Sequence, residues 1–288
     1  MELRAPLSPT APFASIGSSV AHSPFSSRIV WITGASSGIG EALALAFAQA
    51  GATLVLSSRR PAELDRVRLA CARAADHLCL PLDLAQCDTF PVAVATVLAR
   101  FGRIDVLVNN GGVSQRSRAL DADPAVERAI MEVDYFAPVA LTKAVLPSML
   151  ARRAGRVVVV SSVMGYVGTP GRSSYAAAKH ALHGYFDSLR AEIWRDGVQV
   201  TLACPGYVLT QVSANALGPR GKPHARTDAT HRRGISAERC AAAILRGVAR
   251  GREEIVVGGT ETLAIPLKRF APWLYSRLVR RMKFSVSP

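Results

Sequence analysis

The chain has 288 residues, 49% of them hydrophobic, which is enough for one large α/β domain or two small ones. It carries 35 basic and 21 acidic residues, a formal net charge of +14, without a nucleic-acid-binding motif and with only 6% aromatic residues, so we expect no nucleic-acid partner. No apolar run approaches the roughly 18 residues of a membrane span. Five cysteines without a CxxC spacing indicate a reducing compartment and no metal site.

Residues 1–27 are rich in Ser, Pro and Ala and lack the continuous apolar core of a secretory signal. We expect them to form a disordered leader ahead of the folded domain. Together with the cysteine pattern, this predicts a cytoplasmic protein.

The first folded segment is predicted to be a strand, a glycine-rich turn and a helix. Residues 29–32 are a short apolar run, and residues 41–50 are an Ala/Leu-rich stretch typical of a helix. Glycines in such a turn let the backbone approach a phosphate, and the helix N-terminus presents N–H groups to it. In this setting a glycine-rich turn indicates a dinucleotide site. The predicted cofactor-binding residues here are Gly34, Ser36, Ser37, Gly38, Ile39 and Gly40.

The end of the next strand predicts which dinucleotide is bound. Residues 52–57 form that strand, and Ser58, Arg59 and Arg60 follow it. An acidic residue at this place would bind the ribose 2′-hydroxyl of NAD(H), whereas an arginine pairs with the 2′-phosphate of NADP(H). The sequence therefore favours NADP(H), with Ser58 and Arg59 as binding residues. The alternative, that the arginines are only solvent-exposed loop residues, applies more readily to Arg60 than to Arg59.

The middle of the chain continues the alternation of strands and helices. Strands are expected over residues 78–82 and 104–109, and helices over 61–75, 90–101 and 125–152. Polar or small residues follow both strands, where a cofactor would pass the carboxyl edge of a parallel sheet. The predicted cofactor-binding residues at these strand ends are Asp83, Leu84, Asn110 and Gly111.

A tyrosine and a lysine lie one helical turn apart beyond the next strand. A Val-rich run at residues 156–160 leads to Ser162, and a helix is expected from Ser174 onward. Tyr175 and Lys179 share a face of that helix, and a lysine ammonium there stabilises the tyrosine phenolate. The tyrosine then becomes a proton donor and acceptor useful near neutral pH, and Ser162 is a candidate to bind the same substrate oxygen. Taken alone, such a pair is more often an ordinary surface pair.

The last third of the chain completes one domain. Strands are expected at residues 198–203 and 254–257, a helix at 236–250 and a polar substrate loop at 211–235. The alternation predicts a single α/β domain over residues 28–260, a doubly wound (Rossmann) parallel sheet of about seven strands with helices on both faces.

With these residues in view, the chain resembles the short-chain dehydrogenase/reductases. Within that family it is similar to the 11β-hydroxysteroid dehydrogenase-like subgroup and, more closely, to the dehydrogenase/reductase member 7 group. That closer likeness rests on residues 109–117, 135–143 and 205–215. The cues for the family are Thr33–Gly40, Asn109–Gly112, Ser162, Tyr175 with Lys179, and Pro205-Gly206.

The resemblance implies hydride transfer between a nicotinamide and a carbonyl or alcohol carbon. Tyr175 would exchange the proton with the substrate oxygen, Ser162 would polarise that oxygen, and Lys179 would bind the nicotinamide ribose. Val208 and Thr210 would hold the carboxamide, and Asp83 the adenine. The family often forms homodimers or homotetramers through the helices at about residues 125–150 and 175–195.

One position departs from the family pattern. Asp134 stands where the family usually has an asparagine, whose backbone carbonyl holds a water near the lysine. An ionised aspartate keeps that carbonyl, but its side chain only accepts hydrogen bonds and adds a negative charge. We expect Asp134 to remain part of the catalytic group and to alter the activity without abolishing it.

The C-terminal segment, residues 261–288, is basic and interleaved with Leu, Phe, Trp and Tyr. Such a pattern suits peripheral contact with a membrane interface. It equally suits a helix that caps the substrate pocket or packs on a second subunit, and both roles are compatible.

The sequence thus predicts an NADP(H)-dependent oxidoreductase that acts on a small-molecule carbonyl or secondary alcohol, with an apolar, steroid- or lipid-like substrate by analogy. The alternative is a catalytically weakened homologue that binds the cofactor and acts as a sensor or scaffold. Asp134 favours the alternative, whereas the presence of Ser162, Tyr175 and Lys179 opposes it.

Overall fold

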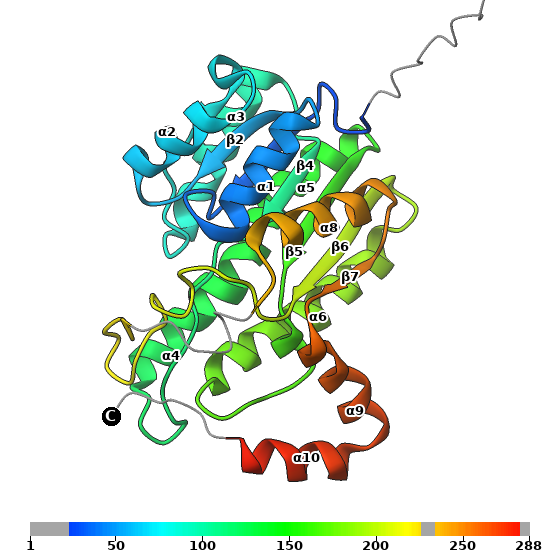
Figure 1. Ribbon diagram of the computed structural model, residues 1–288. Coiled ribbons are helices and arrows are strands. Elements are labelled where there is room, and N and C mark those ends of the chain that lie inside the picture. Colours follow the sequence, from blue (N-terminus) through cyan, green and yellow to red (C-terminus); the bar gives the residue numbers. More distant parts are fainter. Residues whose placement is uncertain (1–22, 226–233, 283–288) are drawn as a thin grey trace, which may run out of the picture.

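The computed structural model describes residues 23–225 and 234–282. Its seven strands form one parallel sheet in the order β3-β2-β1-β4-β5-β6-β7, which confirms the predicted fold class (Figure 1). The order reverses direction between β1 and β4, and sheets of this kind bind ligands at the carboxyl ends of the strands beside such a reversal. The strands are β1 (Ile29–Thr33), β2 (Thr53–Ser57), β3 (Leu78–Cys79), β4 (Val106–Asn109), β5 (Gly155–Val160), β6 (Val198–Pro205) and β7 (Glu254–Val257).

The helices cover both faces of this sheet. One face is covered by α1, α2 and α8, and the other by α3, α5 and α6. The helices are α1 (Gly38–Gln49), α2 (Pro61–Ala70), α3 (Phe90–Phe101), α4 (Pro124–Met131), α5 (Ala137–Ala151), α6 (Ser173–Ile193), α8 (Ala237–Ala249), α9 (Ala264–Phe270) and α10 (Pro272–Arg281). No described helix is both long and apolar enough to cross a bilayer.

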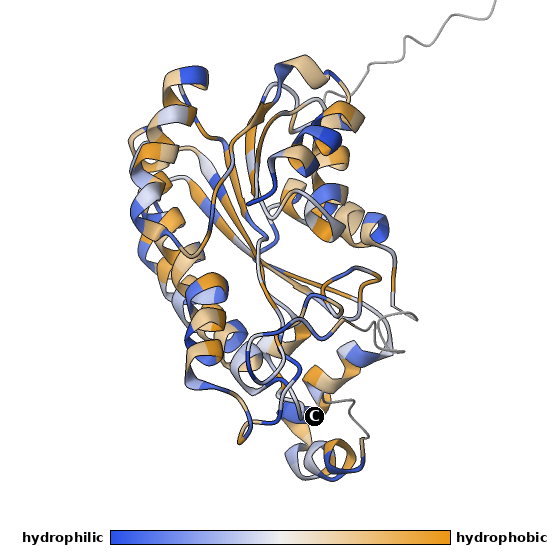
Figure 2. Ribbon diagram, turned by 90° about the vertical axis from the view of Figure 1, so that its left-hand side faces the viewer, coloured by the Kyte–Doolittle hydropathy of each residue, from blue (hydrophilic) through white to orange (hydrophobic). Residues whose placement is uncertain are grey.

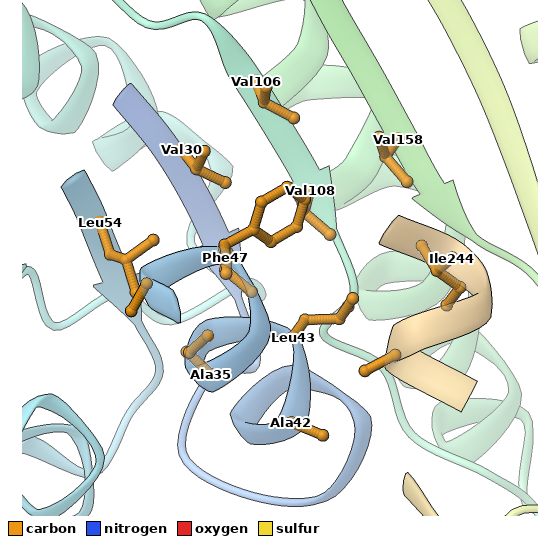
Figure 3. Packing of buried hydrophobic residues seen from close by; sticks show 14 of the residues in the cluster. Val30, Ala35, Ala42, Leu43, Phe47, Leu54, Val106, Val108, Val158 and Ile244 are labelled. Carbon is orange, nitrogen blue, oxygen red and sulfur yellow. The ribbon is translucent and has the colours of Figure 1, made fainter. Parts of the chain in front are cut away.

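Alternation along the buried strands divides the core into two layers. In β1, Val30 and Ile32 pack toward α1, while Trp31 packs toward the opposite helices. Figure 3 shows Leu43 and Phe47 of α1 against Val30 and the neighbouring strands. Figure 2 shows mostly apolar strands between two layers of helices that contain both polar and apolar residues. Burying both faces makes these strands rigid supports for the loops at their ends.

Two elements are shorter than the sequence predicts. The strand β3 ends at Cys79 and not at Leu82, and Pro81, on the open edge of the sheet, lies just beyond it. The amides of Leu80 and Leu82 still donate to β2 and to Ser58, so the chain stays extended. Helix α2 ends at Ala70 and not near residue 75, and a separate 3₁₀ turn follows it.

The helical region predicted at residues 125–152 is present, but a π-helical turn over Glu132–Phe136 divides it into α4 and α5. Pro138 lies four residues after Asp134 and cannot donate to the Asp134 carbonyl, which breaks the α-helical pattern there. The Asp134 side chain is completely buried inside this turn. π turns of this kind often mark functional sites.

Order begins earlier than Arg28, the predicted end of the leader. Phe25 is 2% exposed and meets the ring of Phe47 edge-on at 4.9 Å. The last residues of the predicted leader are therefore part of the core, and residues 1–22 lie outside the described residues. At the other end, α9 and α10 pack on the loop that follows β5, and the remainder of the predicted C-terminal segment also lies outside the described residues.

Candidate active site

The glycine-rich turn after β1 is held against the end of β4 more closely than any side chain would allow. Gly34 has a φ of +64°, and a Cβ on it would lie 2.7 Å from the Cα of Gly111. A Cβ on Gly40 would collide with the Gly34 carbonyl oxygen and lie 2.5 Å from Nδ2 of Asn110. The turn therefore needs glycine for its own shape, and it points the N-terminus of α1 toward the carboxyl edge of the sheet (Figure 1).

Hydrogen bonds from the end of β4 fix the same turn. Asn110 Nδ2 donates to the carbonyl oxygens of Thr33 and Gly34 at 2.9 and 3.3 Å. The hydroxyl oxygen of Thr33 accepts from the amides of Asn110 and Gly111 at 3.0 and 3.1 Å. Thr33 is buried and was not among the predicted site residues, although it stands at the carboxyl end of a buried strand.

Two more predicted cofactor residues reach this turn. A Cβ on Gly38, where φ is +59°, would lie 3.1 Å from Cγ2 of Thr210, and one on Gly111 would lie 2.5 Å from Cδ1 of Leu84. Val208 is buried and forms an isolated parallel bridge with Ile235. Asp83 lies half-buried at the end of its strand, and its Oδ1 accepts from the Ala85 amide at 3.1 Å.

The two arginines after β2 make different contacts. Arg60 Nη2 donates to the hydroxyls of Ser36 and Ser37 at 3.0 and 3.5 Å, so Arg60 contacts the glycine-rich turn. Arg59 is exposed, and Ser58 Oγ accepts from the Arg60 amide at 3.2 Å. Arg60 is thus the arginine that hydrogen-bonds to the turn, which its place three residues after the strand did not reveal.

Lys179 and Asp134 form a buried ion pair. Nζ of Lys179 lies 3.2 Å from Oδ2 of Asp134 and donates to the Val160 carbonyl at 3.3 Å, and it lies 5.5 Å from the centroid of the Tyr175 ring. Oδ1 of Asp134 accepts from the Val113 amide at 2.7 Å. Among the described residues, Asp134 Oδ2 has no well-aligned hydrogen bond, so charge is what holds it beside the lysine. The pair connects α6 with the π turn, and the Val113 amide connects that turn with the loop after β4.

Burial and the neighbouring charges have opposite effects on the pKa values of this pair. Burial raises the pKa of Asp134, and the Lys179 charge and the Val113 amide oppose that rise without cancelling it. Burial works against the charge of Lys179, but Asp134 and Tyr175 outweigh it, so the pKa of Lys179 is raised. Lys179 is therefore a permanent cation near neutral pH, next to an aspartate that has too few donors.

Ser162 and Tyr175 are each held by the backbone around them. Ser162 Oγ donates to the Pro205 carbonyl at 3.3 Å and accepts from the Met164 amide at 3.1 Å. The side-chain oxygen of Gln115 accepts from the amides of Ser174 and Tyr175 at 2.8 and 3.4 Å, which caps the first turn of α6. Gln115 also was not predicted, because about 60 residues separate it from the helix that it caps.

A buried polar cluster, made of Ser161, Tyr166, His183 and Cys204, lies behind Ser162. His183 Nε2 is 3.0 Å from Ser161 Oγ and 3.7 Å from Cys204 Sγ, and Tyr166 donates to Cys204 Sγ at 3.4 Å. Burial lowers the pKa of His183 and raises that of Cys204 to about 12, so both are neutral near pH 7. His183 follows Lys179 by one helical turn, which is the only sequence signal that could have pointed to it.

Residues that follow six of the strands, β1 to β6, thus lie along one edge of the sheet. The glycine-rich turn packs against Gly111 in the loop after β4. In the same loop the Val113 amide donates to Asp134, and Asp134 pairs with Lys179. Such an arrangement is typical of the dinucleotide-binding oxidoreductases.

Comparisons with known proteins identify the family. The family model described as short chain dehydrogenase matches residues 28–219. The chain is 43% identical over 261 residues to a dehydrogenase/reductase SDR family protein 7-like of Anopheles gambiae, which covers 88% of this chain and 82% of that protein. It is 37% identical to human dehydrogenase/reductase SDR family member 7, over 88% of this chain and 78% of the relative. The chain belongs to the short-chain dehydrogenase/reductase family and resembles its member 7 group.

Solved structures agree with that assignment. A short-chain dehydrogenase from Streptomyces avermitilis superposes with a TM-score of 0.75 at 29% identity, over 90% of this chain and 99% of that one. A metagenomic short-chain oxidoreductase in complex with NADP superposes with a TM-score of 0.67 at 27% identity, over 81% of this chain and 97% of that one.

Proposed function

We propose that the protein is an NADP(H)-dependent oxidoreductase that interconverts a carbonyl and a secondary alcohol. The observation that carries the proposal is the contact chain from the glycine-rich turn through Gly111 and Asp134 to Lys179 beside Tyr175. It links a phosphate-binding turn to a proton-transfer group at one edge of the sheet.

The residues around the turn fit a dinucleotide. The glycines leave backbone where a side chain would otherwise stand, and the N-terminus of α1 presents its amides to a pyrophosphate. Ser58 follows β2 where an acidic residue would repel a 2′-phosphate, and it carries no charge. Arg60 at the turn and the exposed Arg59 beside it supply guanidinium groups for that phosphate, which supports NADP(H) over NAD(H).

The bound cofactor supplies or accepts the hydride at its nicotinamide ring. The chain's own residues handle the proton: Tyr175 gives it to, or takes it from, the substrate oxygen, and Ser162 donates a hydrogen bond to the same oxygen. Lys179 holds a positive charge beside Tyr175 and binds the ribose. Val208 and Thr210 hold the carboxamide, and Asp83 the adenine.

The proposal extends to the substrate class and the assembly. We infer an apolar, steroid- or lipid-like substrate, and a cytoplasmic homodimer or homotetramer with peripheral membrane contact. Phe136, 49% exposed, adjoins a hollow lined by Val139, Ala140 and Lys143 of α5, which supports a subunit contact at that helix.

A second candidate function is favoured by Asp134. A negative charge next to Lys179 opposes the positive field that a tyrosine acid needs, so the protein would bind the cofactor with little turnover and act as a sensor or scaffold. The retention of Ser162, Tyr175 and Lys179 supports the enzyme instead.

Oxidation of NADPH with a panel of ketones, from small aliphatic ketones to steroids, tests the proposal. We expect turnover of an apolar ketone, and a loss of about 10²- to 10⁴-fold in Tyr175→Phe with NADPH affinity retained. NADPH binding without turnover of any member of the panel would support the sensor reading. Equal rates for wild type and Tyr175→Phe would exclude the assigned proton donor.

A further inference from the structure

The two C-terminal helices leave their largest apolar side chains in solvent. Phe270 is 84% exposed, Trp273 71%, Leu278 47% and Met282 45%. Figure 1 shows α10 along the outer edge of the molecule, beyond the carboxyl ends of the strands. Four large apolar side chains are therefore exposed within thirteen residues, and such exposure often marks an interaction site.

These apolar residues alternate with cations. Residues 264–281 contain no acidic residue and five basic ones, which are Lys268, Arg269, Arg277, Arg280 and Arg281. The helical period places Trp273, Arg277 and Arg280 together on the side of α10 opposite the buried Tyr275. We call this outward side of α9 and α10, with Phe270, the basic-aromatic surface.

The inward side is fixed to the body of the protein. Tyr275, 9% exposed, donates its hydroxyl to the Gly168 carbonyl at 2.5 Å and packs with Val163 and Val167. Lys268 Nζ donates to the Tyr166 carbonyl at 2.7 Å. The exposed side chains therefore belong to an anchored pair of helices with an inner core of its own, and not to a frayed tail.

We propose that the basic-aromatic surface docks on an anionic lipid surface. Tryptophan and phenylalanine suit the boundary between headgroups and acyl chains, and arginines pair with the phosphates and carboxylates above it. A second copy of this chain fits poorly, because the chain has a net charge of +14 and a symmetric contact would bring the arginines of the two surfaces against one another. Charge complementarity thus favours lipid.

Docking in this way orients the reaction site. The same helices hold the loop that follows Ser162, and the side chain of Glu261, just before α9, accepts from the Tyr207 amide at 2.8 Å next to Val208. Both loops border the substrate side of the proposed site, so they lie toward the lipid when the surface is docked. This orientation, unlike the docking itself, rests on the proposed function.

Vesicle flotation tests the docking on the full chain. Wild type should float with phosphatidylcholine vesicles that contain about a third phosphatidylserine and should bind pure phosphatidylcholine at least about tenfold more weakly. Phe270→Ala/Trp273→Ala should reduce binding to the anionic vesicles at least about tenfold. Arg277→Gln/Arg280→Gln/Arg281→Gln should reduce it by about fivefold for each charge removed.

Matched controls separate the surface from general effects. Trp194→Ala removes an exposed tryptophan elsewhere, and Arg100→Gln/Arg128→Gln/Arg239→Gln removes the same charge elsewhere. Both should float like wild type. Equal flotation of all variants, or none for wild type, would overturn the proposal. The proposal would also fail if wild type bound no vesicles and Phe270→Ala/Trp273→Ala had a lower molecular mass in solution than wild type. A second copy of the chain would then cover the surface. NADPH binding, measured in parallel without vesicles, reports separately on the proposed function.

Discussion

The two ends of β4 each hold a buried aspartate, and the two are built in opposite ways. Asp105 precedes the strand and is 6% exposed, and Asp134 is completely buried against the loop that follows the strand. Asp105 accepts from the Ile29 amide at 2.8 Å and from Arg103 at 2.9 Å, with Arg152 at 3.3 Å and Arg28 at 3.6 Å. Asp134 has one backbone amide and one cation, Lys179.

The number of partners decides the direction of each pKa shift. Burial works against the charge of Asp105, but the Ile29 amide and the arginines outweigh it, so the pKa of Asp105 is lowered. At Asp134 burial wins and the pKa is raised. Asp105, at the amino end of the sheet, has donors for both carboxylate oxygens and stabilises the fold. Asp134, at the carboxyl end, has few hydrogen-bond donors and keeps the charged Lys179 beside Tyr175, the proposed proton donor.

The largest effect is expected from removing Lys179, the cation that pairs with Asp134. Lys179→Met leaves Asp134 buried without a countercharge, which should cost about 3–5 kcal/mol of stability at neutral pH. Reductase activity should fall by about 10²- to 10⁴-fold because Tyr175 loses its neighbouring charge. Urea unfolding and NADPH oxidation measure the two effects.

A double variant separates these two effects. Lys179→Met/Asp134→Asn should recover most of the lost stability and none of the activity, since no charge remains to be buried. Recovery of activity as well would mean that Lys179 acts only by neutralising Asp134.

Removing the aspartate at the amino end should be the next largest change. Asp105→Asn should destabilise the protein by about 2–3 kcal/mol near pH 7, with the affinity for NADPH unchanged. Because the folded pKa is lowered, this stabilisation is fully present above the ordinary value of 3.8 and is lost as pH falls below it. Denaturation between pH 2 and 7 should show the difference from wild type shrinking at the acid end; a constant difference would contradict the assignment.

A smaller change is expected from neutralising the other aspartate. Asp134→Asn removes the anion that raises the pKa of Lys179, so the pH–rate profile should move toward lower pH. The rate at neutral pH should rise by about tenfold or less. An unchanged profile would show that Asp134 is only structural.

The smallest effect should come from a peripheral arginine of the Asp105 site. Arg28 is 52% exposed and lies 3.6 Å from Asp105, so Arg28→Ala should cost less than about 0.5 kcal/mol. Urea unfolding is again the measurement. A loss as large as that of Asp105→Asn would mean that the Asp105 site is not saturated.

Features set by local spacing were predictable from the sequence. The Gly34–Gly40 turn, the one-turn separation of Tyr175 and Lys179, and the polar ends of apolar strands each follow from backbone geometry over a few residues. The parallel sheet follows from their alternation. Even the departure at Asp134 was visible, because it changes residue type within a motif.

Contacts between distant segments could not be predicted. Arg60 turning back to Ser36, and Gln115 capping the helix of Tyr175, depend on loop paths and rotamers that spacing does not encode. The π turn at Asp134 has a local cause in Pro138, but its coincidence with the Lys179 contact is tertiary. Local patterns specify elements, whereas packing decides which polar groups meet.

Fluorescence titration of NADPH and NADH into wild type, Arg59→Ala and Arg60→Ala tests the central claim most directly. The account predicts that wild type binds NADPH more tightly than NADH by about tenfold or more, and that removing either arginine reduces this advantage, Arg60 the more strongly. Failure of wild type to bind either nucleotide, or equal affinity for both, would contradict it.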